Sequence, residues 1–139
     1  MNALDTNIFV YAADDDEPAK QTKAIQLLDQ LVQTPSETWL LWQVAGEFLS
    51  TMRRWETAGR ITAADVRANI RDVLAMFPLA LPSQDVITSS LDLSSRYSLS
   101  HWDSMLLAAC IDAGVDTLYS EDLDAGTKYD SVTVINPFA

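Results

Sequence analysis

The chain has 139 residues, 48% of them hydrophobic, and a net charge of −11, which indicates one folded domain over residues 1–139 and excludes a disordered chain. Its single cysteine, Cys110, excludes an internal disulfide and a thiolate zinc cluster. The start of the chain does not read as a signal peptide and no apolar run approaches the roughly 20 residues of a membrane span, so we expect a cytoplasmic protein without a membrane segment.

The first half of the chain alternates short apolar runs with helical patterns. Asn2–Leu4 predicts a buried strand, followed by a helix through Tyr11. Pro18 suits the first turn of a helix that runs to about residue 32. Thr38–Trp42 predicts a second buried strand, and the helix after it ends before Gly59. The apolar face of that helix consists of Val44, Phe48, Met52 and Trp55.

The second half continues the alternation. Thr62 and Asp65 have the spacing of a capping box, which predicts the start of a helix that runs to Phe77. The remaining expected elements are a strand over Leu79–Leu81, a helix capped by Ser83 that runs to about Tyr97, a helix from Ser100 through Ala113, and strands over Thr117–Tyr119 and Val132–Ile135. Strands that alternate with helices predict a three-layer α/β/α domain with a mainly parallel central sheet.

Four acids from distant segments are placed to meet at one edge of this sheet. Asp5 follows the first strand and Asp122 follows the strand Thr117–Tyr119, while Glu47 and Asp103 lie in early turns of helices that leave the same edge. Ligands of open α/β sheets bind outside the carboxyl ends of the strands. The four carboxylates are therefore candidates for one catalytic and metal-binding site.

Each acid also has a simpler explanation when it is considered alone. Asp5 can cap the helix that starts at Thr6, and Asp122 can belong to a polar turn. Glu47 can be a surface residue, and Asp103 can form a capping box with Ser100.

Asp103 distinguishes the two explanations. Asp65 has the same spacing after a helix start, but its helix has a charged face, whereas Met105–Ile111 after Asp103 carries no charge and should be buried. A carboxylate beside such a helix needs either a cation or backbone amides as its partner. Because the candidate ligands are all hard oxygen donors, Mg²⁺ or Mn²⁺ is favoured over zinc or copper.

These acid-bearing segments resemble, in order and spacing, the sequence blocks of PIN-domain nucleases, particularly the VapC-type toxins of bacterial and archaeal toxin–antitoxin pairs. The matching segments are Leu4–Ile8, Val44–Leu49, Ser100–Ala109 and Leu118–Gly126. The resemblance implies a PIN-like fold and a Mg²⁺- or Mn²⁺-dependent endoribonuclease that hydrolyses RNA. It also implies a homodimer and a VapB-like antitoxin that blocks the site.

The resemblance further implies roles for individual residues. Asp5 and Asp103 would be the surest metal ligands, Glu47 and Asp122 would complete the pocket, and Asp124 could replace or assist Asp122. Hydrogen bonds that orient the ligands would come from Thr6, Asn7 and Ser120.

The net charge of −11 opposes binding of RNA, because phosphates are repelled by an acidic surface. The stretch from Arg53 to Arg71 is an exception, with five arginines, two acids and a net charge of +3. We expect that Arg53, Arg54 and Arg60 bind RNA phosphates or the antitoxin. A solvated helix surface is the alternative explanation.

Other residues limit the rival functions. His101 is the only histidine, which excludes a ribonuclease with two catalytic histidines and suits a helix start. A phosphatase of the haloacid-dehalogenase type would need an acid at Asn7, and a catalytically silent PIN-like interaction module is a further alternative. Trp102 could stack on a base but is expected to be buried. The other tryptophans, Trp39, Trp42 and Trp55, suit the core or a dimer interface.

Overall fold

A computed structural model describes all 139 residues and contains a six-stranded sheet in the order β3-β2-β1-β4-β6-β5. The strands are β1 (Asn2–Leu4), β2 (Thr38–Leu41), β3 (Leu79–Ala80), β4 (Thr117–Tyr119), β5 (Lys128–Tyr129) and β6 (Val132–Ile135). Neighbouring strands are parallel except at the edge, where β5 pairs antiparallel with β6. The mainly parallel sheet that the alternating pattern predicts is confirmed.

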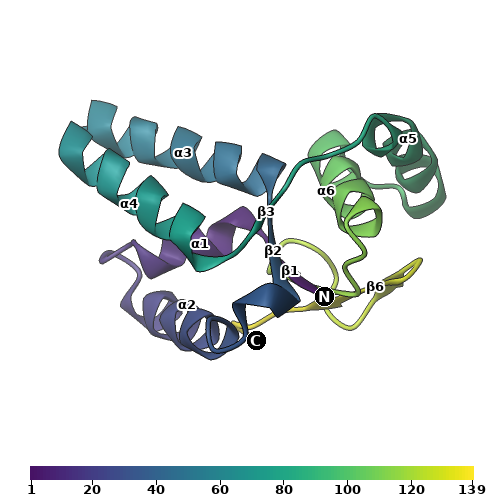
Figure 1. Cartoon of the computed structure of the whole chain (residues 1–139), viewed down its shortest axis with the longest axis horizontal. Helices are drawn as coiled ribbons and strands as arrows, with labels where there is room; N and C mark the ends of the chain where they lie inside the picture. The colour runs from purple at the N-terminus through teal and green to yellow at the C-terminus, as the bar shows by residue number, and fades with distance from the viewer.

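Helices cover the sheet and complete a three-layer α/β/α arrangement. They are α1 (Thr6–Ala12), α2 (Pro18–Leu31), a short 3-10 helix η1 (Pro35–Glu37), α3 (Trp42–Thr57), α4 (Ala63–Met76), α5 (Asp85–Tyr97) and α6 (His101–Asp112). Figure 1 shows α3 and α4 as a long hairpin, with the pair α5–α6 on the opposite side of the molecule from α2. No helix combines the length and apolar character that a membrane-spanning segment requires.

Three details differ from the expectations. The second strand ends at Leu41 and the third at Ala80, each one residue earlier than expected, and Trp42 begins α3. Ser83 does not cap α5, because its amide and hydroxyl both donate to the carboxylate of Asp112, at 3.0 and 2.6 Å. The strand β5 was not predicted, since two residues at a sheet edge carry no periodic pattern.

Helix α3 is held by the face that its spacing predicts. Val44, Phe48 and Met52 are buried at intervals of four residues. The ring of Phe9 from α1 meets Phe48 and Phe77 edge to face, with centroids 6.3 and 6.5 Å apart. Burying a side chain of this size contributes about 1.5–3 kcal/mol, so these contacts fix α1 against α3.

The sheet also sets the position of the first candidate acid. Leu4 of β1 is in register with Tyr119 of β4, and the amide of Asp5 donates to the Tyr119 carbonyl at 2.9 Å. The residues that follow the two strands, Asp5 and Ser120, therefore lie side by side at the carboxyl edge of the sheet. Both are buried, with exposures of 8% and 0%.

Candidate active site

A polar hollow of about 230 Å³ opens at this edge of the sheet and has no hydrophobic residue in its wall. It is lined by Asp5, Thr6, Asn7, Glu47, Ser50, Thr51, Arg54 and Asp122. Three of the four candidate acids therefore come together: Asp5 from the N-cap of α1, Glu47 from α3 and Asp122 from the segment after β4.

Asp5 is held by both oxygens of its carboxylate. It is the N-cap residue of α1, and its Oδ1 accepts from the Thr6 amide at 2.7 Å. Asp5 therefore does cap this helix, as its simpler explanation proposed. Its Oδ2 accepts from the Ser120 hydroxyl at 2.8 Å. The same carboxylate thus starts the helix and faces the hollow.

Glu47 is joined to α1 and to its own helix. Its Oε2 accepts from the Thr6 hydroxyl at 2.9 Å, and its Oε1 accepts from Nε2 of Gln43 at 2.7 Å. The same Gln43 nitrogen donates to the carbonyl of Trp102 at 3.2 Å. Gln43 therefore connects Glu47 with the start of α6.

Asp122 lies at the exposed rim of the hollow. Its Oδ2 accepts from Nδ2 of Asn7 at 3.1 Å, and its amide donates to the Ser120 hydroxyl at 3.1 Å. Asp124, the alternative fourth acid, does not line the hollow. Thr6, Asn7 and Ser120, expected to orient the acids, each donate a side-chain hydrogen bond to one of them.

Asp103 stands at the edge of the site rather than in the wall of the hollow. It is half-buried in the first turn of α6, and its charge acts on Asp122. Its amide donates to the Ser100 hydroxyl at 3.3 Å, but its carboxylate forms no hydrogen bond back to the helix start. In α4 the capping box is complete, since the Thr62 amide donates to the Asp65 carboxylate at 2.9 Å. The carboxylate of Asp103 is therefore free for another partner, unlike that of Asp65.

The electrostatics of the hollow favour a cation. Burial, opposed by hydrogen bonds from Ser120 and Thr6 and reinforced by the charges of Asp122 and Glu47, raises the pKa of Asp5 from 3.8 to about 6. The pKa of Asp122 is also raised, by partial burial of its carboxylate and then by the nearby charges of Glu121 and Asp103. Added positive charge would relieve this repulsion between carboxylates.

The oxygen donors and negative charge of these residues fit a hard divalent cation. The side chains do not form a complete coordination shell. No three His, Cys, Asp or Glu side chains are grouped closely enough to hold one ion. The oxygens of Asp5 and Glu47 are occupied by the hydrogen bonds described above. Mg²⁺ commonly binds through one or two carboxylates and keeps several waters, which this arrangement permits. The acids that could hold such an ion are Asp5, Glu47, Asp103 and Asp122.

The three candidate arginines differ in their surroundings. Arg54 lines the acidic hollow, and both Arg53 and Arg54 line an adjoining hollow of about 500 Å³ along α3. Arg60 is engaged elsewhere, in ion pairs of 2.9 Å with Asp14 and with Asp16. Arg53 and Arg54 are thus available to a ligand of the site, whereas Arg60 is tied to the segment before α2.

The side chains of Cys110 and Trp102 differ sharply in their burial. Cys110 is fully buried in the core, where burial raises the pKa of its thiol. Trp102 was expected to be buried, but 61% of it is exposed, and Trp42 is 56% exposed. Both indoles line an apolar groove of about 550 Å³ that borders Glu47. The prediction that Trp102 is buried is therefore wrong, because its indole lines an open groove and not the core.

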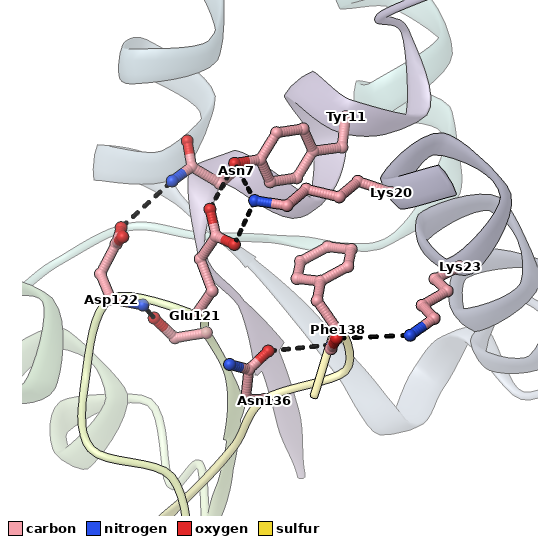
Figure 2. A network of polar contacts seen from close by, with 9 residues as sticks. Asn7, Tyr11, Lys20, Lys23, Glu121, Asp122, Asn136 and Phe138 are labelled. Atoms are coloured by element: carbon pink, nitrogen blue, oxygen red, sulfur yellow. Dashed lines mark hydrogen bonds and ion pairs between the residues drawn. The ribbon is translucent and has the colours of Figure 1, made fainter. Parts of the chain in front are cut away.

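Sequence reasoning missed two sets of supporting residues. Gln43 could have been found from its position four residues before Glu47 on one helix. The second set lies behind Asp122, where Tyr11 and Lys20 contact Glu121 (Figure 2). No local signal indicates these contacts, because they join residues about one hundred positions apart.

Comparison with known proteins places the site in a family context. A profile described as the PIN domain matches residues 3–129. No curated protein sequence matches the chain.

Solved structures with a similar fold include a toxin–antitoxin complex from Klebsiella pneumoniae, with a TM-score of 0.67 and 20% identity over 99% of this chain and 98% of the other. The sarcin–ricin loop cleaving toxin VapC20 of Mycobacterium tuberculosis has a TM-score of 0.68 and 15% identity over 88% and 90% of the two chains. VapBC2 of Rickettsia felis, bound to a DNA fragment from its promoter, gives 0.69 and 13% over 96% of each chain. The TM-scores show a common fold, and identities this low show the fold alone.

Proposed function

Because the chain belongs to the PIN domain family, we propose that it is a metal-dependent endoribonuclease, the toxin of a VapBC-type toxin–antitoxin pair. The observation that carries the proposal is the meeting of Asp5, Glu47 and Asp122 in one polar hollow, with Asp103 at its edge. The descriptions of the similar structures, which include a toxin that cleaves the sarcin–ricin loop, support an RNA substrate. The phosphatase alternative loses its basis, because the chain matches the PIN domain and has Asn7 where that phosphatase needs a second acid.

The four acids would hold one or more Mg²⁺ or Mn²⁺ ions, with Asp5 and Asp103 as the principal ligands. When bound, such an ion would lower the pKa of an attacking water and offset negative charge on the scissile phosphate. The hydrogen bonds from Ser120 to Asp5 and from Thr6 to Glu47 restrict the rotation of both carboxylates before substrate arrives. Attack by water would leave a 5′-phosphate on one product and a 3′-hydroxyl on the other.

The chain's own cations would receive the RNA backbone. Arg54 lines the acidic hollow and Arg53 lies beside it on the same helix, so a phosphate next to the scissile bond can be bound at this wall. Guanidinium groups bind phosphate oxygens through charge-assisted, often bidentate hydrogen bonds. This local positive charge offsets the repulsion expected from a chain of net charge −11.

The deciding experiment is cleavage of labelled RNA by the purified chain with Mg²⁺, with EDTA, and by Asp103→Asn with Mg²⁺. We expect cleavage in the first reaction only, with a loss in the variant of at least about 10- to 100-fold, the range found even when a partner of a metal ligand is removed. Asp65→Asn is the matched control, since Asp65 has the same position in its helix but serves the capping box. Equal cleavage in all reactions would exclude the metal nuclease, and binding of a partner without any cleavage would favour the silent interaction module.

We also propose that the chain forms a homodimer through the apolar groove between α3, the segment after β3, and α6. Its rim carries Trp42, Leu81 and Trp102, of which Leu81 is 69% exposed, and Ile87 and Leu91 of α5 are exposed by 62% and 70%. Exposed apolar patches of this kind mark interaction sites. Leu81→Glu should convert the dimer to a monomer in sedimentation, whereas Leu74→Glu, on exposed α4, should not. A wild-type monomer would contradict the proposal.

A VapB-like antitoxin would block the acidic hollow and restrain the toxin in the cytoplasm, where its RNA targets lie. Toxin–antitoxin complexes among the similar structures support this partner. Expression of the chain should arrest growth, expression of Asp103→Asn should not, and co-expression of the antitoxin should restore growth. Arrest by both forms would separate toxicity from the acids.

A further inference from the structure

The hydrogen bonds behind Asp122 form a continuous network that the proposed chemistry does not use. Lys20 Nζ donates to Glu121 Oε2 at 3.0 Å and to the Tyr11 hydroxyl at 3.1 Å, and the Tyr11 hydroxyl donates to Glu121 Oε1. Figure 2 shows both oxygens of Glu121 engaged on this side, while its neighbour Asp122 turns toward Asn7.

We propose that Lys20 and Tyr11 are positioning residues, which hold Glu121 and thereby aim Asp122 into the acidic hollow. This inference rests on the proposed function, because it concerns the metal site assigned there. Lys20 and Tyr11 do not line the hollow, so they act only through the segment that follows β4.

The segment needs such support because regular structure ends just before it. The last ladder contact on this side is the Ser120 amide, which donates to the Ile135 carbonyl at 2.9 Å, and the chain from Glu121 to Thr127 belongs to no helix or strand. The hydrogen bonds of Asp122 go only to the Ser120 hydroxyl and to Asn7, each at 3.1 Å, and its neighbour Leu123 is buried in the core. Glu121 therefore adds a second link to the helical layer, beside the bond from Asn7 of α1.

This second link is built from partly buried groups. The Glu121 side chain is 17% exposed and the Lys20 side chain 39%. The ammonium group of Lys20 also lies 4.6 Å from the centre of the Tyr11 ring, which meets Phe138 edge to face at 5.1 Å. Without Lys20, a half-buried carboxylate would stand beside Asp122 with no cation in contact, and repulsion would turn the segment away from the site.

A matched control lies one turn further along α2. Lys23 Nζ donates to the carbonyl of Phe138 at 3.3 Å, so it ties the same helix to the C-terminal segment but does not contact Glu121. Lys23→Ala removes the same charge from the same helix without releasing Asp122.

The experiment measures Mn²⁺ binding by calorimetry in the metal-free chain, with kcat and KM for RNA cleavage as a second readout. For Lys20→Ala we expect Mn²⁺ affinity to fall by about 10- to 100-fold, the range for partners of metal ligands, and kcat to fall more than KM rises. Lys20→Arg, whose guanidinium can donate to both partners, should recover most of the loss. Lys23→Ala should match the wild type.

Tyr11→Phe and Glu121→Gln keep the proposal testable if Lys20→Ala folds poorly, because each removes one hydrogen bond or one charge at nearly constant volume. Both should weaken Mn²⁺ binding while the melting temperature stays close to that of Lys23→Ala. Wild-type Mn²⁺ affinity in folded Lys20→Ala, Tyr11→Phe and Glu121→Gln would overturn the positioning role. If the wild type itself neither binds Mn²⁺ nor cleaves RNA, the proposed function fails instead, and the two outcomes are distinguishable.

Discussion

The Thr6 hydroxyl donates to Oε2 of Glu47 at 2.9 Å and joins two residues 41 positions apart at the wall of the acidic hollow. The backbone amide of Thr6 donates to Oδ1 of Asp5, the N-cap of α1, so a single residue contacts two of the four acids. Geometry of this kind prepares carboxylates for a cation before the cation arrives.

Replacing Thr6 by valine should separate this role from packing. Thr6→Val keeps the shape but loses the bond to Glu47, so we expect Mn²⁺ affinity and cleavage rate to fall by about tenfold. Calorimetry and a cleavage assay measure the two quantities. Unchanged affinity in a folded variant would remove Thr6 from the site.

The loss of the Thr38 hydroxyl, unlike that of Thr6, should stabilise the fold. Thr38 is fully buried in β2, and its Oγ1 is the only buried side-chain oxygen or nitrogen without a hydrogen-bond partner. Thr38→Val removes an unsatisfied polar group at constant shape, so the free energy of unfolding should rise by about 1 kcal/mol. Urea denaturation measures the change, and Mn²⁺ binding should stay at the wild-type level. A decrease in stability would mean that the hydroxyl has a partner in solution.

The pKa of Asp5 predicts how the stability of the metal-free protein depends on pH. Its pKa is about 6 in the folded chain against 3.8 ordinarily, so the folded state holds the proton more tightly. The free energy of unfolding should therefore fall as pH rises from about 4 to about 6 and stay lower above that range. Asp130, with a pKa of about 2, acts in the opposite sense only at lower pH.

Asp5→Asn should abolish cleavage and flatten this pH dependence. An amide carries no charge to bury, so the metal-free variant should be more stable than the wild type at pH 7 by about 1–3 kcal/mol. Chemical denaturation at several pH values, with EDTA present, checks the result. A variant less stable than the wild type at pH 7 would show that the buried charge of Asp5 does not destabilise the folded protein.

Asp65 and Asp103 occupy equivalent positions in two helices and should respond differently to alanine. Asp65→Ala breaks a reciprocal capping box and should lower the melting temperature without changing cleavage. Asp103→Ala removes a carboxylate without a hydrogen bond in its helix start, so it should abolish cleavage with a smaller effect on melting. The reverse pattern would assign Asp103 to helix capping.

Arg53 and Arg54 should contribute to the salt dependence of RNA binding. Reversing both to Glu should weaken binding, and the loss of two phosphate contacts should flatten the slope of log K against log salt by about 1.4 for single-stranded RNA. Arg67→Glu with Arg71→Glu, on exposed α4, provides the control of equal charge. The same slope in both double variants would point to a general charge effect.

Much of the fold was predictable because its signals are local. The capping box of Thr62 and Asp65, the apolar spacing along α3 and the order of strands and helices each depend on residues within one segment. The same is true of the four acid-bearing blocks, whose order along the chain already suggested the family. Asp5 was placed correctly because a parallel strand leads directly to the sheet edge.

Only the tertiary structure determined the contacts between distant segments. The amino-acid sequence places Ser83 before a helix, but only packing shows that Asp112 takes its hydrogen bonds. It contains Lys20 and Glu121 without indicating that they meet, and Trp102 without indicating that it faces outward. Local conformation follows from neighbouring residues through sterics and periodicity. The contacts between segments depend on how the helices pack against the sheet and against one another. The sequence by itself thus predicted the candidate acids, and the fold determined which of them share one hollow and which side chains hold them there.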